Sequence, residues 1–435
     1  MALLISWIVS SAFQLPAFQL KQKEIEETVG MEDPHGLALP GMTRLGKEPS
    51  ADLKPFKSIQ EITPLLQRPV LILATATITQ DNIFSNGLFQ NIYLFYKMFD
   101  AMGYTTILLV NSKPKNLEGV PDILRSCRVI SVEDLIKQPI PVKVYIEIGM
   151  SIDNTIRRFL KMIGAKTCKL YLGNILNIDT ETPVFYPGMN FAHHVVGEIE
   201  EIWVSPHYGQ HAEYASALNH VKLDTPRAKV APYIWDPIIL TDDGRRRIQW
   251  TPPQPNDTYK IIVMEPNISF QKTSIVPIMA MERWYRNHKS WNGELCIFNG
   301  ERLLMTPFFK ETILPTLDIF KDGKLKLLGR RDIISILKEY PSATFILHQW
   351  NNEYNYMLFE LFWAGYPVIH NAMSWSPFGY CYAGADLNAI GSLYDSILAT
   401  HHEKAESYRA HARALTWKHS PYNPEVQKAW AELLA

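Results

Sequence analysis

Polar side chains gather in residues 344–371, directly after a predicted strand. The apolar run at residues 345–347 is typical of a strand that is buried on both faces. The polar residues that follow it are His348, Gln349, Asn351 and Asn352. Open parallel sheets bind their ligands outside the carboxyl ends of the strands. These side chains are therefore candidates for holding a ligand.

The next helix of this stretch contains one acid, Glu360, within the apolar sequence MLFELFW. An unpaired carboxylate is costly to bury, so we expect Glu360 to have a partner. Gly365 is predicted to end the helix. The following strand, PVIHN, brings Asn371 to the same edge of the sheet.

A second polar group follows the predicted strand 259–265, where Glu265 and Asn267 precede Lys272. The pattern predicts a helix over about 272–288, which places Lys272 at its start. A lysine there opposes the helix dipole, and a bound phosphate would resolve that conflict. A solvated lysine is the alternative.

The first strand–helix junction, residues 75–90, carries Ser85, Asn86, Gly87 and Gln90. It lacks the GxGxxG spacing of a dinucleotide site. Backbone N–H groups at this helix start could bind a phosphate or an acceptor carboxylate. Helix capping by Ser85 and Asn86 explains the same residues equally well.

His193 and His194 are candidates for an acid or base, with a structural role as the alternative. Asp179 and Glu181 are rival candidates for a base. Neither carboxylates nor cysteines lie at ligand spacing beside the two histidines, and no DxD follows a strand. The sequence therefore predicts no metal site and no resident cofactor.

Composition narrows the class of protein. The chain has 435 residues, 47% of them hydrophobic, and a net charge of −1, which gives no general nucleic-acid-binding footprint. The four cysteines have no zinc spacing, and we expect reduced, mostly buried thiols in a cytoplasmic protein. Residues 1–58 are predicted to form a partly disordered N-terminal extension. Its apolar start lacks a basic region, and membrane association is the lesser alternative.

Strands alternate with helices from residue 69 onward, which predicts an α/β protein with parallel sheets. The pattern stops in a Pro-rich stretch and then restarts. We expect two Rossmann-like domains facing a central cleft, at 59–240 and 259–402, with a linker at 241–258 and C-terminal helices at 403–435.

Residues 359–369, FELFWAGYPVI, resemble the second half of a motif found in many GT-B glycosyltransferases. In that motif two glutamates with seven residues between them lead into a helix, a glycine and PVI. Glu360 falls on the second glutamate, which in the family contacts the ribose of the nucleotide. The first glutamate falls on Asn352, and Glu353 lies one residue out of register. We count Asn267, Asn352 and Glu353 among the candidate donor-binding residues.

More closely, the chain resembles an uncharacterised bacterial and viral family of predicted GT-B glycosyltransferases. The resembling segments are SNGLFQN (85–91), IWVSPHY (202–208), APYIWDP (231–237), EPNISFQKTS (265–274), HQWNNEYNY (348–356), GYPVIHN (365–371) and GYCYAGAD (379–386). The resemblance implies that Lys272 meets the donor pyrophosphate and that residues 348–352 line the nucleotide or sugar. It also implies that Asn371 approaches the donor and that the C-terminal helices pack back on the first domain.

These features together favour a metal-independent glycosyltransferase, transferring a hexosyl or pentosyl group. The donor would be a nucleotide-sugar such as a UDP- or GDP-sugar, and the acceptor a glycan or small molecule. Two alternatives stay open. One is transfer to modified bases of viral DNA, and the other is a non-catalytic nucleotide-sugar binding module. No stable membrane insertion is expected.

Overall fold

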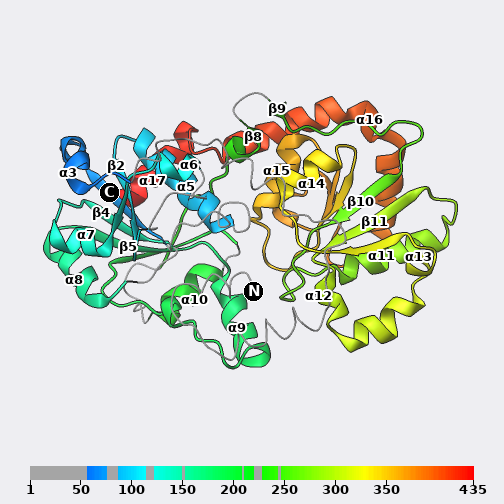
Figure 1. The fold of residues 1–435 in the computed structure, drawn as a ribbon, viewed down its shortest axis with the longest axis horizontal. Coiled ribbons are helices and arrows are strands. Elements are labelled where there is room, and N and C mark those ends of the chain that lie inside the picture. Colours follow the sequence, from blue (N-terminus) through cyan, green and yellow to red (C-terminus); the bar gives the residue numbers. More distant parts are fainter. Residues whose placement is uncertain are drawn as a thin grey trace. The chain divides into compact units, whose positions relative to one another are not determined.

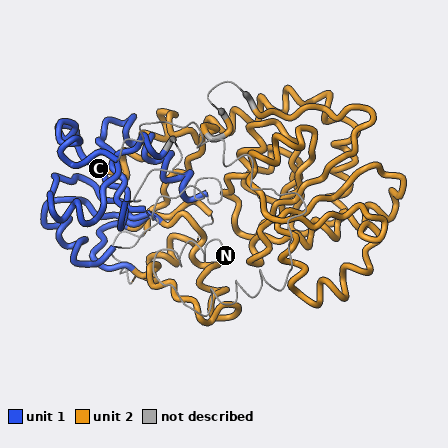
Figure 2. Tube along the Cα trace, in the orientation of Figure 1, with its two compact units in different colours: residues 1–170, 196–201 blue, residues 171–195, 202–435 orange. Residues whose placement is uncertain are grey.

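A computed structural model describes residues 56–75, 87–113, 122–148, 152–207, 210–219, 228–242 and 246–435 (Figure 1). Almost all of the predicted extension 1–58 lies outside these residues, and so do Ser85 and Asn86. The chain divides into two compact units (Figure 2). Unit 1 comprises residues 1–170 and 196–201, and unit 2 comprises residues 171–195 and 202–435.

The first sheet has seven strands in the order β3-β2-β1-β4-β5-β6-β7. The strands are β1 (Val70–Ala74), β2 (Thr105–Val110), β3 (Val129–Ser131), β4 (Val144–Glu147), β5 (Lys166–Tyr171), β6 (Glu201–Val204) and β7 (Lys229–Val230). β1 pairs in parallel with β2 and with β4. Every residue of β1 and β2 is buried, because the strands are rich in Val, Ile and Leu and are covered on both faces.

Short helical elements accompany this sheet. They are α3 (Ile59–Ile62), η1 (Thr63–Gln67), α5 (Gly87–Ala101), α6 (Asp122–Arg125), α7 (Val132–Lys137), α8 (Asn154–Met162), α9 (Ile175–Phe185), η2 (Ala192–His194), α10 (Gln210–Leu218) and η3 (Pro237–Ile239). Side-chain caps set several starts: Ser131 and Asp134 form a capping box on α7, and Asn174 accepts the backbone N–H of Asn177 on α9.

The second sheet has six strands in the order β12-β11-β10-β13-β14-β15, and every neighbouring pair is parallel. The strands are β10 (Tyr259–Val263), β11 (Gly293–Phe298), β12 (Leu325–Leu328), β13 (Thr344–Ile346), β14 (Val368–His370) and β15 (Tyr380–Cys381). The chain order reverses between β10 and β13, which is the switch point where such sheets bind ligands.

Helices and short turns join these strands. They are α11 (Ile275–Arg286), α12 (Glu301–Leu304), η4 (Phe308–Ile313), η5 (Leu314–Thr316), α13 (Asp318–Lys321), α14 (Ile333–Glu339), α15 (Tyr356–Ala364) and η6 (Met373–Trp375). α15 ends where the sequence predicts, because Gly365 adopts a left-handed φ of 77° that favours glycine. The two parallel sheets with their helices confirm the predicted α/β class.

Two helices close the chain, α16 (Leu387–Lys418) and α17 (Pro424–Leu434). α16 packs against α11 and α15 (Figure 1). Trp430 of α17 lies edge-on to Trp203 of β6, with ring centroids 5.7 Å apart. The expected return of the C-terminal helices to the first sheet is therefore confirmed.

The predicted domain boundaries at 59–240, 241–258, 259–402 and 403–435 stay predictions. The predicted linker carries a small antiparallel hairpin, β8 (Thr241–Asp242) with β9 (Arg246–Arg247). α16 continues without a break through residue 402, the predicted end of the second domain.

Unit 1 contains a buried ionic network. Glu147, which is fully buried, accepts hydrogen bonds from Lys169 (2.8 Å) and from Arg157 (2.9 Å). Burial alone would raise the pKa of Glu147, but the charges of Lys169 and Arg157 hold that pKa below its usual value. Glu147 therefore stays ionised, and each member of the network depends on the others.

Replacing Arg157 with Met should destabilise the protein by about 3–5 kcal/mol, because the Glu147 charge loses a buried partner. The neighbouring Arg158→Met is the matched control. Arg158 is exposed and pairs with Glu198, so its loss should change the stability far less. Thermal unfolding of both variants measures the difference. Because the folded pKa of Glu147 is lowered, the gap between variants should shrink as the pH falls through that pKa.

Candidate functional site

Two side chains meet at the switch point of the second sheet. Glu265 follows β10 and His348 follows β13, and His348 donates its backbone N–H to Glu265 Oε1 (3.1 Å). Both residues are buried. This bond ties together the ends of the two strands that flank the expected ligand crevice.

The carboxyl group of Glu265 lies in an unusual electrostatic setting. Burial raises its pKa to about 7, although the nearby charge of Lys272 and the His348 N–H act in the opposite direction. Burial lowers the pKa of Lys272, and Glu265 partly offsets that effect. Within the described residues Glu265 Oε2 has no hydrogen-bond partner. A pKa this far from the ordinary value, caused by burial next to a charge, is typical of functional sites.

The loop 265–274 presents Lys272, and Asn267 shapes that loop. Asn267 has a left-handed φ of 53°. Its amide Nδ2 donates to the carbonyl of Glu265 (3.1 Å), and its Oδ1 accepts the N–H of Ser274 (2.8 Å). The predicted helix start is wrong, since α11 begins at Ile275 and Lys272 lies in the loop before it. Lys272 therefore does not oppose the dipole of α11 from within its first turn. It still lies beside the switch point, where it pairs with Gln349.

Gln349 and Asn371 join β13 to β14 at the same edge. Asn371 accepts the backbone N–H of Gln349 (2.8 Å) and donates to its carbonyl (2.7 Å). Gln349 also forms a β-bridge with Lys272, and Trp350 donates its N–H to the Gln271 carbonyl (2.8 Å). The structure thus brings Lys272, His348, Gln349 and Asn371 together, and their role in binding a donor stays a prediction.

His348 also contacts a tyrosine of the next loop. Its Nδ1 lies 2.8 Å from the hydroxyl of Tyr382, which donates to the Leu347 carbonyl (3.1 Å). With the hydroxyl proton used in that way, Nδ1–H of His348 is the donor to Tyr382. Burial lowers the pKa of His348, so the ring is neutral near pH 7.

Three other predicted donor residues lie nearby with different roles. Glu353 accepts the backbone N–H groups of Met373 (2.8 Å) and Ser374 (3.1 Å), and so it caps η6. Asn352 is half-buried. Glu360 is only 2% exposed. Burial raises the pKa of Tyr233, and the nearby charge of Glu360 adds to that rise. The contact of Glu360 with a ribose stays a prediction.

A separate polar trio forms around α9. The carboxylate of Asp179 accepts Nδ1–H of His194 (2.6 Å) and the hydroxyl of Tyr214 (2.6 Å). Two of the three predicted catalytic candidates are therefore in direct contact. The third, His193, lies beside them, with its ring centroid 4.5 Å from that of His194. The trio has the arrangement of a carboxylate-oriented histidine, in which the lone pair of His194 lies on Nε2.

The opposite side of α9 holds the loop that carries Lys272. Glu181 is 1% exposed, and its Oε1 accepts the Ser269 hydroxyl (2.8 Å) and the Phe270 N–H (3.1 Å). Tyr186 donates to the Ile268 carbonyl (2.6 Å). Glu181, our rival candidate for a base, thus positions the loop through both hydrogen bonds.

The sequence reasoning missed His207, which follows β6. Its Nε2 lies 2.8 Å from the Leu172 carbonyl, which can only accept, so Nε2 carries the proton. Its Nδ1 is buried and has no partner among the described residues. Burial lowers the pKa of His207 to about 4, and the Lys272 charge adds to that effect. The sequence feature that could have indicated His207 is its position just after a predicted strand, in IWVSPHY.

Several buried polar atoms of unit 2 have no hydrogen-bond partner within the described part of the chain. Among them are His207 Nδ1, Glu265 Oε2 and Gln349 Oε1. Buried polar groups are nearly always paired with protein, water or ligand. All three residues follow strand carboxyl ends, His207 in the first sheet and Glu265 and Gln349 in the second, and parallel sheets bind their ligands at such ends.

The predicted phosphate loop is only partly described. α5 begins at Gly87, and Gln90 is buried on it. Both residues belong to unit 1, whereas the polar atoms above belong to unit 2. Their role stays a prediction.

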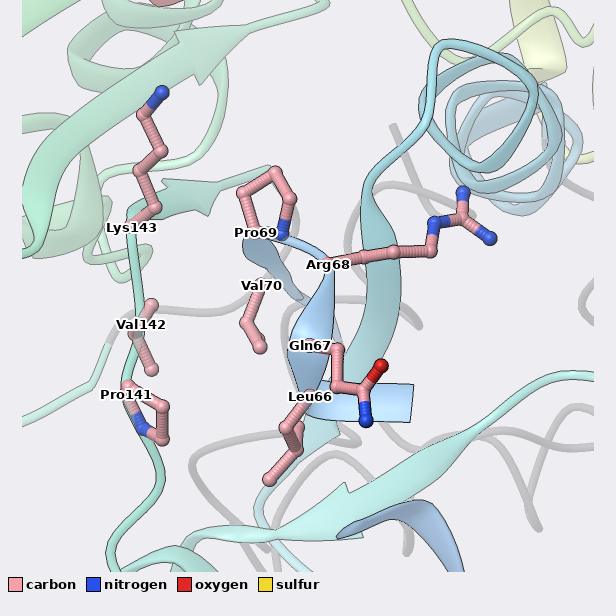
Figure 3. Close-up of a pocket in the computed structure, with 8 residues that line it drawn as sticks. All are labelled: Leu66, Gln67, Arg68, Pro69, Val70, Pro141, Val142 and Lys143. Atoms are coloured by element: carbon pink, nitrogen blue, oxygen red, sulfur yellow. The ribbon is translucent and has the colours of Figure 1, made fainter. Parts of the chain in front are cut away.

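A shallow pocket of about 320 Å³ lies elsewhere in unit 1 (Figure 3). Residues 66–70 and 141–143 line it. These segments lead into β1 and β4, so the pocket lies at the amino ends of the strands. Ligands of such sheets bind at the carboxyl ends, and the pocket is not our candidate site.

The described residues contain no group of three or more His, Cys, Asp and Glu side chains arranged to hold a metal ion. No described helix is both long and apolar enough to span a membrane.

Solved structures define the fold class. The chain is similar to a glycosyltransferase from Rickettsia africae (14% identity, TM-score 0.52) and to sucrose-phosphate synthase from Thermosynechococcus elongatus (13%, 0.50). It is also similar to alpha,alpha-trehalose 6-phosphate synthase from Burkholderia multivorans (9%, 0.51). Each likeness covers 84% of this chain and 98% of the other. The protein has the GT-B fold, which confirms that part of the resemblance.

The chain belongs to the family DUF2827, described as a protein of unknown function, whose model matches residues 72–434. No curated protein matches the chain. The expected link to a family of predicted glycosyltransferases stays a prediction.

Buried neutral histidines should make stability depend on pH. Burial lowers the pKa of His207, His211, His370 and His401 from 6.5 to about 4. On unfolding between those pH values they take up protons, so the melting temperature should fall as the pH is lowered from 6.5 toward 4.

His207→Gln should flatten this pH dependence, because the amide keeps a donor for the Leu172 carbonyl but cannot titrate. His402→Gln, at an exposed position of α16, is the control. Equal slopes for wild type and His207→Gln would contradict a buried, neutral His207.

Proposed function

We propose that this protein is a glycosyltransferase that moves a sugar from a nucleotide-sugar donor to a glycan or small-molecule acceptor. The observation that carries the proposal is the convergence of Lys272, Glu265, His348 and Gln349 at the switch point of a GT-B fold. A lysine cation and unpaired polar atoms at that edge suit an anionic, hydroxyl-rich ligand.

The leaving group would be a nucleoside diphosphate, whose developing negative charge must be stabilised. Lys272 supplies a positive charge at the crevice, and the loop that carries it is fixed by Asn267 and Glu181. Fixed donors need little reorganisation during the reaction. We therefore propose transfer without a metal ion. In this proposal Glu360 binds the ribose of a UDP- or GDP-sugar.

The acceptor hydroxyl must lose a proton as it attacks. Asp179 holds Nδ1–H of His194, so the lone pair of His194 Nε2 is the proton acceptor in our proposal. Tyr214 donates to the second oxygen of Asp179 and fixes the carboxylate in place. His193 would assist from the same turn.

Donor binding gives a direct test. A nucleotide-sugar at about 100 times its Kd should stabilise the protein by roughly 2.7 kcal/mol. We expect a rise in melting temperature with at least one of UDP-glucose, UDP-galactose, GDP-mannose and ADP-glucose. Lys272→Ala should abolish that rise because the diphosphate loses its cation. Lys310→Ala, an exposed lysine of the same half, should keep it. If no nucleotide-sugar shifts the wild type, the proposal is wrong.

The base is tested by substitution in the trio. Asp179→Asn and His194→Gln should each lower kcat about 10²–10⁴-fold, since general-base catalysis contributes that much. KM for the donor should change little, because the trio does not hold Lys272. The rates are measured by incubating the enzyme with the donor and a mixture of candidate glycan and small-molecule acceptors, and following the glycosylated product by mass spectrometry. Tyr214→Phe keeps the hydrogen bond between His194 and Asp179, so its kcat should fall much less. An undiminished kcat in Asp179→Asn would remove the trio from the mechanism.

A further inference from the structure

Glu265 has two oxygen atoms in different situations. Oε1 is fixed by the backbone N–H of His348 (3.1 Å), and Oε2 is buried with no partner among the described residues. The residue is fully buried at the end of β10, the central strand beside the switch point. Oε2 therefore belongs to the part of the site where a donor diphosphate would lie.

An ionised Glu265 would oppose such a ligand. A carboxylate only accepts hydrogen bonds, and its charge would repel phosphate oxygens. A carboxylic acid instead donates one O–H and keeps an acceptor for the His348 N–H. We propose that Glu265 binds the donor diphosphate as a neutral acid, by donating an O–H from Oε2 to a phosphate oxygen. This inference rests on the proposed function and adds a binding residue to the same site.

The groups around Glu265 support this protonation state. The groups that face it are Lys272 from its own loop, His348 after β13 and the hydroxyl of Tyr382 after β15. His348 is neutral, and burial raises the pKa of Tyr382, so that hydroxyl is also neutral. Lys272 is thus the cation that stabilises the Glu265 anion.

A diphosphate would change that balance. It would pair with Lys272 and so reduce the stabilisation that the lysine gives to the Glu265 anion. Its own negative charge would also favour the neutral acid. Because burial already raises the pKa of Glu265 to about 7, a small further rise makes it protonated throughout the neutral range. Binding then takes one proton from solvent for each Glu265 that was ionised, and release of the nucleotide returns it.

The test is isothermal calorimetry with the nucleotide-sugar that gives the largest thermal shift, in buffers of different ionisation enthalpy. A nucleotide-sugar has no phosphate group that titrates near neutral pH, so proton uptake reports on the protein. Wild type should take up about half a proton per ligand at pH 7 and close to one proton at about pH 8. Its Kd should rise about tenfold for each pH unit above that range.

Glu265→Gln is the informative variant. Its amide keeps an acceptor for the His348 N–H and donates permanently from the Oε2 position. We expect binding near the wild-type strength at low pH, no proton uptake and a Kd that does not change with pH. Glu282→Gln is the matched control: that buried glutamate accepts the N–H groups of Asp318 and Ile319 on α13, and the variant should take up protons as wild type does. Melting curves confirm that both variants fold.

The outcomes separate the two proposals. Nucleotide-sugar binding without proton uptake, or uptake that persists in Glu265→Gln and so comes from Lys272, would overturn the role of Glu265 alone. If no nucleotide-sugar binds, the same titration is run with inorganic pyrophosphate. A difference in proton uptake between wild type and Glu265→Gln would then support Glu265 as a diphosphate-binding residue and overturn the nucleotide-sugar as the ligand. Absence of pyrophosphate binding as well would overturn both.

Discussion

The hydrogen bond from the His348 backbone to Glu265 joins the two strands on which the candidate site depends. β10 and β13 are neighbours in the sheet although β11 and β12 lie between them in the chain. In sheets of this kind ligands bind outside the carboxyl ends of the strands at such a reversal. The polar loops that follow β10 and β13 meet at this point.

α9 carries two carboxylates with separate tasks. Asp179 and Glu181 are two residues apart, so about 200° of helix rotation separates them. One orients His194, and the other holds the loop that carries Lys272. The proton acceptor and the diphosphate cation of the proposed reaction are thus attached to one short helix. A shift of α9 would move both groups together.

The sequence predicts the architecture better than the contacts. Apolar runs such as VLILA and the stop at Gly365 follow local rules, so the strands and the end of α15 are predictable. α9 is not, because its apolar residues lack helical spacing and Pro183 lies inside it. The contact of Asp179 with His194 also needs a tertiary fold, although both residues are candidates on sequence alone. The sequence pattern places Lys272 in a helix because capping by the distant Asn267 side chain cannot be read locally.

The packing of Trp430 against Trp203 links the last helix to β6 of the first sheet. During synthesis the first sheet emerges before α17 has been made. Trp203 of β6 therefore lacks its contact with Trp430 until the end of the chain has been synthesised. Contacts between residues so distant in sequence slow folding, and exposed apolar surface in the meantime favours aggregation. The first sheet is therefore completed only when α17 has been made.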